Sequence, residues 1–474
     1  MSQTITIDPV SRIEGHAKIT IELDEQKQVR DAHFHITQFR GFEKFCEGRP
    51  FTEMPSLMAR ICGICPVSHL VASAKACDAI MAVRIPETAA KLRRIMNLAQ
   101  HIQSHALSFF HLSSPDLLLG MDSDPATRNI FGVMQAHPHL ALDGIKLRKF
   151  GQQIIEWLGG KRIHPAWIVP GGVNEPLTEE RRDQILAEIP GAMQIILRTL
   201  EWFKEASVKY TDEIRHFANF NTMFFGLVDE GGGLEMYDGV IRIVDAQGNV
   251  VADRLDPANY QDFIGEAVEP YSYLKSPYYK NVGYPEGIYR VGPLARLNIA
   301  SHIGTPLAHK EWEEFRGPNK RVILSSFHYH LARLIEILYG IEMIEKLLNE
   351  PDILSDRVRA VAGPNSLEGI GVSEAPRGTL MHHYRIDKHG LITWANLIIA
   401  TGHNNLAMNK GVLQVAKAYL KGTQPTEGML NRVEAVIRCY DPCLSCSTHA
   451  VGHMPLVLQV RSHDGEILGE TARK

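Results

Sequence analysis

Four of the seven cysteines form two Cys-x-x-Cys pairs, near opposite ends of the 474-residue chain. The first pair is Cys62 and Cys65, and the second is Cys443 and Cys446. A spacing of three residues around a turn or a helix start can aim both sulfurs of a pair at one ion. Soft sulfur donors favour zinc, copper(I), iron–sulfur or nickel–iron chemistry over magnesium or calcium. Together, the two pairs predict a four-thiolate metal site.

Each pair is followed by a histidine, His69 in the first motif and His449 in the second. A structural zinc site is the alternative interpretation. Small zinc modules usually take their ligands from one short segment, because they need the metal to fold. Here the pairs lie far apart in a chain with ample core, which favours a buried catalytic centre.

The remaining cysteines lack the paired spacing and are expected as buried thiols: Cys46, Cys77 and Cys439. Three are too few to hold a four-cysteine iron–sulfur cluster, so a partner protein must carry electrons away. Several histidines are assigned no role and are expected to be packed or on the surface: His328, His330, His382 and His383. The Gly369-Ile-Gly371 segment lacks the third glycine of a dinucleotide fingerprint, so no NAD or flavin site is expected in this chain.

Composition narrows the class of protein. The chain is 45% apolar and 22% charged, with a net charge of −4. This balance argues against disorder and against binding to nucleic acid or an anionic membrane surface. We see no run of 18 apolar residues and no secretory signal. The odd cysteine count, without such a signal, argues against a disulfide framework.

Hydrophobic periodicity places the motifs on elements. Alternating residues predict strands over Thr4–Val10, His16–Leu23 and Val29–Phe39. Three- and four-residue steps predict long helices, one beginning near Ile85 and the others over Thr178–Phe217 and Ser325–Asn349. Further strands are expected over Tyr237–Val244, Val250–Leu255, Leu456–Arg461 and Glu466–Glu470, with Pro257–Leu297 irregular.

This order predicts an α+β fold, in which a central bundle of long helices carries small peripheral sheets at the N-terminus, middle and C-terminus. We expect a single domain over 1–474. Its expected segments are 1–84 (strands and the first cysteine pair), 85–219 (helices), 220–297 (a strand and irregular insertion), 298–449 (helices, an arginine-containing loop and the second cysteine pair) and 450–474.

Six blocks of sequence resemble the large, catalytic subunit of nickel–iron hydrogenases, in the order of that family. They are Arg12-Ile-Glu14-Gly-His16, Arg40-Gly-Phe-Glu43, Arg60 to His69, His105 to His111, Glu374-Ala-Pro-Arg377-Gly and Asp441 to His449. The segment Arg40–Arg49 is most similar to the cytoplasmic, bidirectional NAD-linked branch. The resemblance implies reversible cleavage of dihydrogen in the cytoplasm.

The resemblance also implies a nickel–iron centre whose iron carries cyanide and carbon monoxide. Cys62 and Cys443 would bind nickel terminally, Cys65 and Cys446 would bridge both metals, and Cys443 would receive a proton. Glu14 would relay that proton, with a pKa raised by burial. Arg377 would stand over the open metal position.

Further positions follow from the same resemblance. Asp116 and Asp441 would be carboxylate partners of Arg377. Thr401 would donate a hydroxyl to cyanide, beside Ala400, and His69 would donate to a bridging sulfur. Glu43, His449 and the carbonyl of Leu397 would hold magnesium, or iron, at a second site.

The implied partners are an iron–sulfur small subunit, flavin- and NAD-binding diaphorase subunits, nickel-insertion factors and a maturation endopeptidase. Iron–sulfur clusters, flavin and NAD would belong to the partners, and neither nucleic acid nor membrane is expected. Residues 450–474 would be a C-terminal extension that the endopeptidase removes. A metal-free relative, the quinone-site subunit of respiratory complex I, is the second alternative, against which the four cysteines count.

Overall fold

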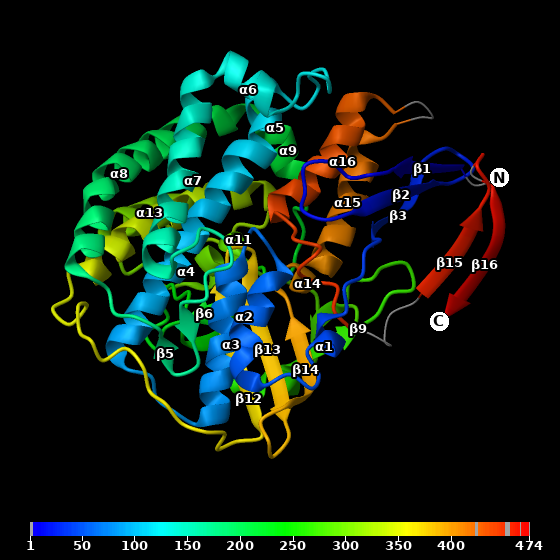
Figure 1. Ribbon diagram of the computed structural model, residues 1–474. Helices are drawn as coiled ribbons and strands as arrows, with labels where there is room; N and C mark the ends of the chain where they lie inside the picture. The colour runs from blue at the N-terminus through cyan, green and yellow to red at the C-terminus, as the bar shows by residue number, and fades with distance from the viewer. Residues whose placement is uncertain (1–2, 422–424, 451–455, 465, 474) are drawn as a thin grey trace.

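The computed structural model describes residues 3–421, 425–450, 456–464 and 466–473. Its fold is α+β, with long helices at the centre and several small separate sheets (Figure 1). None of the helices in these ranges has the length and apolar character that crossing a membrane requires.

The N-terminal strands form the sheet that the alternating pattern predicts. Strands β1 (Gln3–Ile7), β2 (Ala17–Leu23) and β3 (Val29–Ile36) pair antiparallel in that order. Every second residue of β2 is buried, so one face of the sheet packs inward. Helix α15 (Asn405–Tyr419) contacts β3, which brings the two ends of the chain together.

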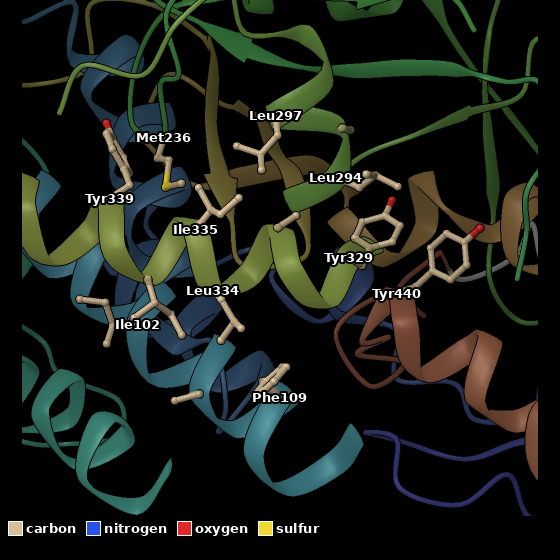
Figure 2. Packing of buried hydrophobic residues seen from close by; sticks show 14 of the residues in the cluster. Ile102, Phe109, Met236, Leu294, Leu297, Tyr329, Leu334, Ile335, Tyr339 and Tyr440 are labelled. Carbon is tan, nitrogen blue, oxygen red and sulfur yellow. The ribbon is translucent and has the colours of Figure 1, made fainter. Parts of the chain in front are cut away.

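The core of the molecule is a bundle of the longest helices. These are α4 (Glu87–Leu107), α7 (Pro138–Gly159), α8 (Glu179–Ser207) and α13 (Tyr329–Leu348). Ile102 of α4 and Leu334 lie on one side of α13, while Met236 and Leu297 lie on the opposite side (Figure 2). Helix α13 is therefore enclosed, and even its polar residues Arg333 and Glu336 are fully buried.

Two elements that position the metal centre differ from expectation. Helix α3 (Pro66–Met81) follows the first cysteine pair within a segment expected to be mainly strands. A three-stranded antiparallel sheet lies within 298–449, where helices were expected: β12 (Glu368–Ala375), β13 (Gly378–Ile386) and β14 (Ile392–Ile398). The helix and the sheet are both buried on nearly all sides. Their residues therefore lack the alternation of polar and apolar positions from which a helix or strand is predicted.

The middle of the chain is more regular than expected. One sheet has the order β11-β6-β7-β8: β11 (Tyr289–Arg290), β6 (Met223–Val228), β7 (Val240–Val244) and β8 (Val250–Leu255). The stretch expected to be irregular over Pro257–Leu297 contains short elements: α10 (Tyr260–Phe263), β9 (Ile264–Ala267), β10 (Ser276–Tyr279) and the start of α11 (Pro293–Ile299). These elements are too short to show the hydrophobic period of a helix or a strand in the sequence.

Short elements connect the remainder. The helices are α1 (Phe42–Phe45), α2 (Met54–Met58), α5 (Ser114–Leu119), α6 (Ile130–Ala136), α9 (Thr211–His216), α12 (Pro306–Arg316), α14 (Ala400–His403) and α16 (Glu427–Tyr440). The strands are β4 (Ile168–Val169), β5 (Gly172–Val173) and the expected C-terminal hairpin of β15 (Leu456–Arg461) and β16 (Ile467–Arg473), which lies at the edge of the view in Figure 1.

Candidate metal centre

The structure brings the two cysteine pairs to one point. The Sγ atoms of all four residues lie within 4.8 Å of one another and all four are buried: Cys62, Cys65, Cys443 and Cys446. Sγ of Cys62 is 3.4 Å from that of Cys443, and Sγ of Cys65 is 3.5 Å from that of Cys446. Within the described ranges, no other group of three or more His, Cys, Asp or Glu residues is gathered in this way.

Local backbone structure explains how each pair reaches the centre. Cys62 is extended after a short 3-10 turn, and Cys65 caps helix α3, whose first residue is Pro66. Proline suits the first position of a helix because its missing N–H needs no partner there. The second pair follows Asp441, whose left-handed conformation ends helix α16.

Burial and mutual hydrogen bonding shape the acidity of the thiols. Hydrogen bonds from Cys443, Cys446 and Cys62 hold the pKa of Cys65 well below its ordinary value. Burial raises the pKa values of Cys443 and Cys446 well above theirs. The cluster therefore favours one thiolate at Cys65 that the neighbouring thiols stabilise. A soft metal ion fits this donor set, because it would take the place of the protons on the other sulfurs.

Arg377 lies at the turn between β12 and β13 and is held against the second cysteine segment. Its Nε donates to the Asp441 carbonyl at 2.6 Å, and its Nη2 is 3.1 Å from the Asp441 carboxylate. Burial would lower the pKa of Arg377, but the charges of Asp441 and of the cysteines outweigh burial and raise it well above its ordinary value. A fixed cation therefore faces the sulfurs.

A small cavity lies beside the sulfurs, with room for about one water molecule (≈ 10 Å³). Thr401 lines it, and its Oγ accepts the amide N–H of Cys443 at 2.9 Å. The hydroxyl proton of Thr401 is therefore free to point elsewhere. The complete lining is Cys65, Ser68, His69, Ala375, Arg377, Leu380, Ile399, Ala400, Thr401, Cys443 and Cys446.

Glu14 lies directly alongside the second cysteine pair. Glu14 and Cys443 form a parallel β-bridge, and the amide of Leu444 donates to the Glu14 carbonyl at 3.1 Å. The Ser445 hydroxyl and amide both donate to the Glu14 carboxylate. A Cβ on Gly15 would lie 2.7 Å from Cβ of Leu444, so only glycine permits this approach. The Glu14 residue is half-buried in the isolated chain.

Asp116 is not a partner of Arg377, contrary to expectation. Its carboxylate pairs with Arg12 at 2.5 Å and with Arg438 at 2.9 Å. Burial would raise the pKa of Asp116, but these arginines outweigh burial and lower it. Among the described residues, the carboxylate bonded to Arg377 is that of Asp441, two positions before Cys443 in the same segment. Asp116 instead joins the N-terminal segment to α16.

Glu43, Leu397 and His449 lie in the region expected to bind a second cation. The Leu397 amide donates to Glu43 at 2.8 Å, so their observed contact is through nitrogen rather than the carbonyl. The described residues give neither buried ring nitrogen of His449 a hydrogen-bond partner, and burial lowers the pKa of this ring well below its ordinary value. A neutral, unpartnered imidazole fits a metal ligand. The ammonium of Lys275 lies 3.4 Å from Glu43.

His69 is hydrogen-bonded to the Cys65 sulfur, and its Nδ1 lies 3.1 Å from Nε2 of His382. His382, for which the sequence alone predicts no role, is thus a buried neighbour of the centre. His383, the next residue, bonds Tyr260 and Glu368 away from the centre. The alternation of a strand separates the two histidines, and recognising β13 in the sequence would have distinguished them.

A family model described as nickel-dependent hydrogenase matches residues 40–128 and 236–449, which together are more than half of the chain and include both cysteine pairs. A second model, described as HoxL-like, matches residues 4–39.

The whole chain is similar to proteins of known activity. It is 43% identical to the NAD-reducing hydrogenase HoxS subunit beta of Cupriavidus necator, over 100% of both chains. It is 41% identical to a subunit of the F420-non-reducing hydrogenase vhc of Methanococcus voltae, over 98% of this chain and 99% of that one. A solved structure of an NAD+-reducing [NiFe]-hydrogenase in the H2-reduced state matches with a TM-score of 0.91 and 45% identity, covering 94% of this chain and 99% of that one.

Proposed function

Because the chain belongs to the nickel-dependent hydrogenase family, we propose that it cleaves dihydrogen within a complex that passes the electrons to NAD or NADP. The family assignment makes it the catalytic subunit of a nickel–iron hydrogenase. The observation that carries the proposal is the convergence of four buried thiols beneath Arg377. The acceptor is proposed from similarity to the NAD-reducing relative.

The thiols would hold the metals in two roles. Cys62 and Cys443 would bind nickel, while Cys65 and Cys446 would bridge to an iron that carries cyanide and carbon monoxide. When bound, this group supplies the redox chemistry that splits dihydrogen. Four soft donors in a dry pocket fit such a group. The same set without a metal would leave thiols crowded against one another.

Arg377 and Thr401 would act on the cavity side. The buried guanidinium places a fixed positive charge and several N–H donors near the sulfurs. Because Oγ of Thr401 already accepts the Cys443 amide, its O–H is free to donate into the cavity, and Ala400 contributes an apolar wall beside it. Together they would orient anionic ligands and exclude water.

Cys443 and Glu14 would move the proton. Their backbones pair directly, so the Glu14 carboxylate is held next to the segment that carries Cys443. Ser445 donates to this carboxylate and fixes its position. Since Glu14 is only half-buried, it connects the centre to the exterior of this chain. A carboxylate in this position can accept and pass on a proton.

A second cation site would be formed by His449, Glu43 and the Leu397 carbonyl. The two buried ring nitrogens of His449, which have no hydrogen-bond partner among the described residues, support it. Burial raises the pKa of Glu43, an effect that a cation would reverse. Magnesium or iron would displace the Lys275 ammonium from Glu43 and anchor the end of the second motif.

Electrons would leave through partner proteins in the cytoplasm. The spare thiols Cys46, Cys77 and Cys439 are buried separately and do not join a cluster in the described ranges. As partners we propose flavin- and NAD-binding diaphorase subunits together with an iron–sulfur small subunit, and nickel-insertion factors during assembly.

The experiment is purification of the native complex, followed by hydrogen-dependent reduction assays. We expect NAD or NADP reduction by the complex, and reduction of an artificial dye by the catalytic and small subunits alone. Dye reduction without NAD or NADP reduction by the complete complex would overturn the proposed acceptor and leave the hydrogenase assignment intact.

Residues 450–474 are proposed to be removed after metal insertion by a dedicated endopeptidase. The cleavage point at Ala450 or Val451 adjoins 451–455, which lie outside the described residues. Mass spectrometry of active enzyme should find a polypeptide that ends near His449. A major species that retains Lys474 would contradict it.

A further inference from the structure

The backbone of the β12–β13 turn, which carries Arg377, is bound by a buried arginine of helix α11. Arg296 donates from Nη1 to the carbonyl of Ala375 at 2.9 Å and from Nη2 to the carbonyl of Pro376 at 3.3 Å. These carbonyls belong to the two residues directly before Arg377. Arg296 thus binds the backbone of the turn, whereas Asp441 binds the guanidinium at the far end of the Arg377 side chain.

Two carboxylates hold the Arg296 guanidinium itself. Its Nε and Nη2 donate to Glu336 of α13 and its Nη1 donates to Glu374 of β12, each at 2.7 Å. All five of its N–H groups therefore have an acceptor, and the side chain is fully buried. Burial would lower the pKa of Arg296, but Glu336 and Glu374 outweigh burial and raise it, so the guanidinium stays charged.

The carboxylate of Glu374 also reaches across the turn. Its Oε2 accepts from Arg296, while its Oε1 accepts the hydroxyl of Thr379 on β13 at 2.7 Å. One side chain therefore joins the strand that enters the turn to the strand that leaves it. The start of α11 meets the turn directly, since a Cβ on Gly292 would lie 2.7 Å from the Arg377 carbonyl oxygen.

The place of the Arg377 guanidinium depends on both ends of its side chain. Asp441 fixes the tip, and the bonds from Arg296 fix the backbone from which the side chain extends. Bonds from a charged donor in a buried site are strong, so the turn cannot shift without breaking them. Electrostatic stabilisation depends on such a group being held in place before the reaction begins.

We propose that Arg296 is a positioning residue for Arg377. Through the carbonyls of Ala375 and Pro376 it fixes the turn, and so sets the distance of the Arg377 guanidinium from the cysteine sulfurs. The described residues that line the cavity beside the sulfurs do not include Arg296, so it acts through Arg377. The consequence for catalysis rests on the proposed function, whereas the fixed position of the turn does not.

Arg296→Lys tests the role in the matured complex. Lysine keeps a positive charge between Glu336 and Glu374, but one ammonium cannot also bind both carbonyls in the planar geometry of arginine. We expect nickel and iron content to be unchanged and KM for dihydrogen to stay the same. Turnover per nickel should fall about 10²-fold, the loss that a shift of about 1 Å in a catalytic group can cause. The cyanide and carbonyl infrared bands should move, because the charge beside these ligands is displaced.

Arg93→Lys is the matched control. Arg93 is also fully buried, and it likewise binds a carboxylate and two backbone carbonyls, those of Asp78, Val169 and Gly172. Both substitutions should lower the unfolding midpoint. Arg93→Lys should nevertheless keep the infrared bands and the turnover per nickel of the natural enzyme, because its partners do not belong to the β12–β13 turn.

Amide hydrogen exchange of the full chain, isolated without metal, gives an independent measurement. Peptides that contain the β12–β13 turn should exchange faster in Arg296→Lys than in the natural chain or in Arg93→Lys. Thr379→Val offers a second route if Arg296→Lys does not fold. It keeps the shape of the side chain and removes the hydroxyl that joins β13 to Glu374, so the same changes should appear to a smaller extent.

Bands and turnover per nickel that match the natural enzyme in Arg296→Lys would overturn the proposal, and so would turn peptides that exchange no faster. Where Arg296→Lys does not fold, the same results in Thr379→Val would overturn it. Equal changes in Arg93→Lys, or a loss confined to KM, would also overturn it, because neither points to a displaced Arg377. Failure of the proposed function would instead appear as absent cyanide and carbonyl bands in the natural enzyme, with the exchange result unaffected.

Discussion

At the scale of single residues, the centre is defined by side chains whose charges are fixed by burial and close partners. Arg377 keeps its charge because Asp441 and the cysteines outweigh the cost of burial. Asp441 shows the opposite effect, since burial raises its pKa although Arg377 opposes the shift. The ion pair with Asp441 holds the charged Arg377 side chain beside the sulfurs in a site that is buried from solvent.

Arg377→Lys should leave the metal centre assembled but lower hydrogen oxidation by about 10²–10³-fold, the loss typical of one well-placed electrostatic donor. Lysine retains a charge but cannot reproduce the forked contact with Asp441. The measurement combines turnover with nickel and iron content. Turnover within twofold of the natural enzyme at equal metal content would contradict this role.

Glu14→Gln should preserve the shape of the side chain and its contacts with Ser445 while removing the proton acceptor. We expect metal content to be unchanged and hydrogen oxidation to fall by about 10²–10⁴-fold. The exposed residue Glu53 offers a matched control, as Glu53→Gln. Equal turnover of the two variants would exclude a proton relay through Glu14.

The spacing of the cysteines was sufficient to predict the four thiol positions, because the two sulfurs of a Cys-x-x-Cys pair lie close enough to bind one ion wherever the pair is placed. It failed for Asp116, whose partners Arg12 and Arg438 are remote in the chain and depend on how the ends fold back. It also failed for His382, whose significance depends on the face of β13 and on a helix opposite it.

At the scale of elements, strand β12 packs closely against helix α3. This contact places the β12–β13 turn, which carries Arg377, next to the first cysteine pair. A Cβ on Gly371 would lie 2.0 Å from the Ala72 carbonyl oxygen, so the strand reaches the helix backbone itself. The Gly369-Ile-Gly371 segment, which does not match a nucleotide fingerprint, thus has a packing reason.

Gly371→Ala should separate α3 from the β12–β13 hairpin and so move Arg377 away from Cys65. Overpacking of this kind costs about 1–3 kcal/mol. We expect a lower unfolding midpoint and less bound nickel, measured by denaturation and metal analysis. Gly363→Ala is the control, since a Cβ there meets nothing within 4 Å. Identical behaviour of both variants would refute the positioning role of this contact.

A buried charge network joins the elements behind the centre. Glu336 of α13 bonds Arg296 of α11 at 2.7 Å and His105 of α4 at 2.8 Å. Burial would raise the pKa of Glu336, but the charge and hydrogen bonds of Arg296 outweigh burial and lower it to about 2. Since the ordinary pKa is about 4.5, the stabilisation is complete above pH 4.5 and is lost as pH falls toward 2.

Glu336→Gln should therefore destabilise the chain by about 3–5 kcal/mol at neutral pH, because Arg296 loses a buried partner. The difference from the natural chain should shrink as pH falls from about 4.5 toward 2. Unfolding midpoints measured across pH test it. Glu47→Gln, which removes an exposed pair with Lys44, should cost at most about 1 kcal/mol. A difference that grows on acidification would contradict the assignment.

Some helices and strands could be predicted from the sequence, and others could not. Long helices whose apolar residues recur at three- and four-residue steps, such as α4, α8 and α13, and the alternating strands β2 and β3 were expected close to their observed positions. Helix α3 and the β12–β14 sheet were not, because burial on all sides leaves no period to detect.

At the scale of the whole molecule, the chain closes on itself at the metal centre. Glu14 pairs with Cys443, and Arg12 reaches Asp116 and Asn431. A metal held by both cysteine pairs would add a link between segments separated by nearly the whole chain. Such a link restrains a very long loop, so loading with metal should increase stability as well as supply chemistry.

The most direct measurement is infrared spectroscopy combined with metal analysis of the protein matured in its own host. We expect one nickel and one iron at the four-cysteine site, with cyanide and carbonyl bands. The two metals and both sets of bands should disappear together in Cys65→Ser and Cys446→Ser. Zinc bound to the four cysteines, with no such bands, would show that these thiols do not build a hydrogen-cleaving centre.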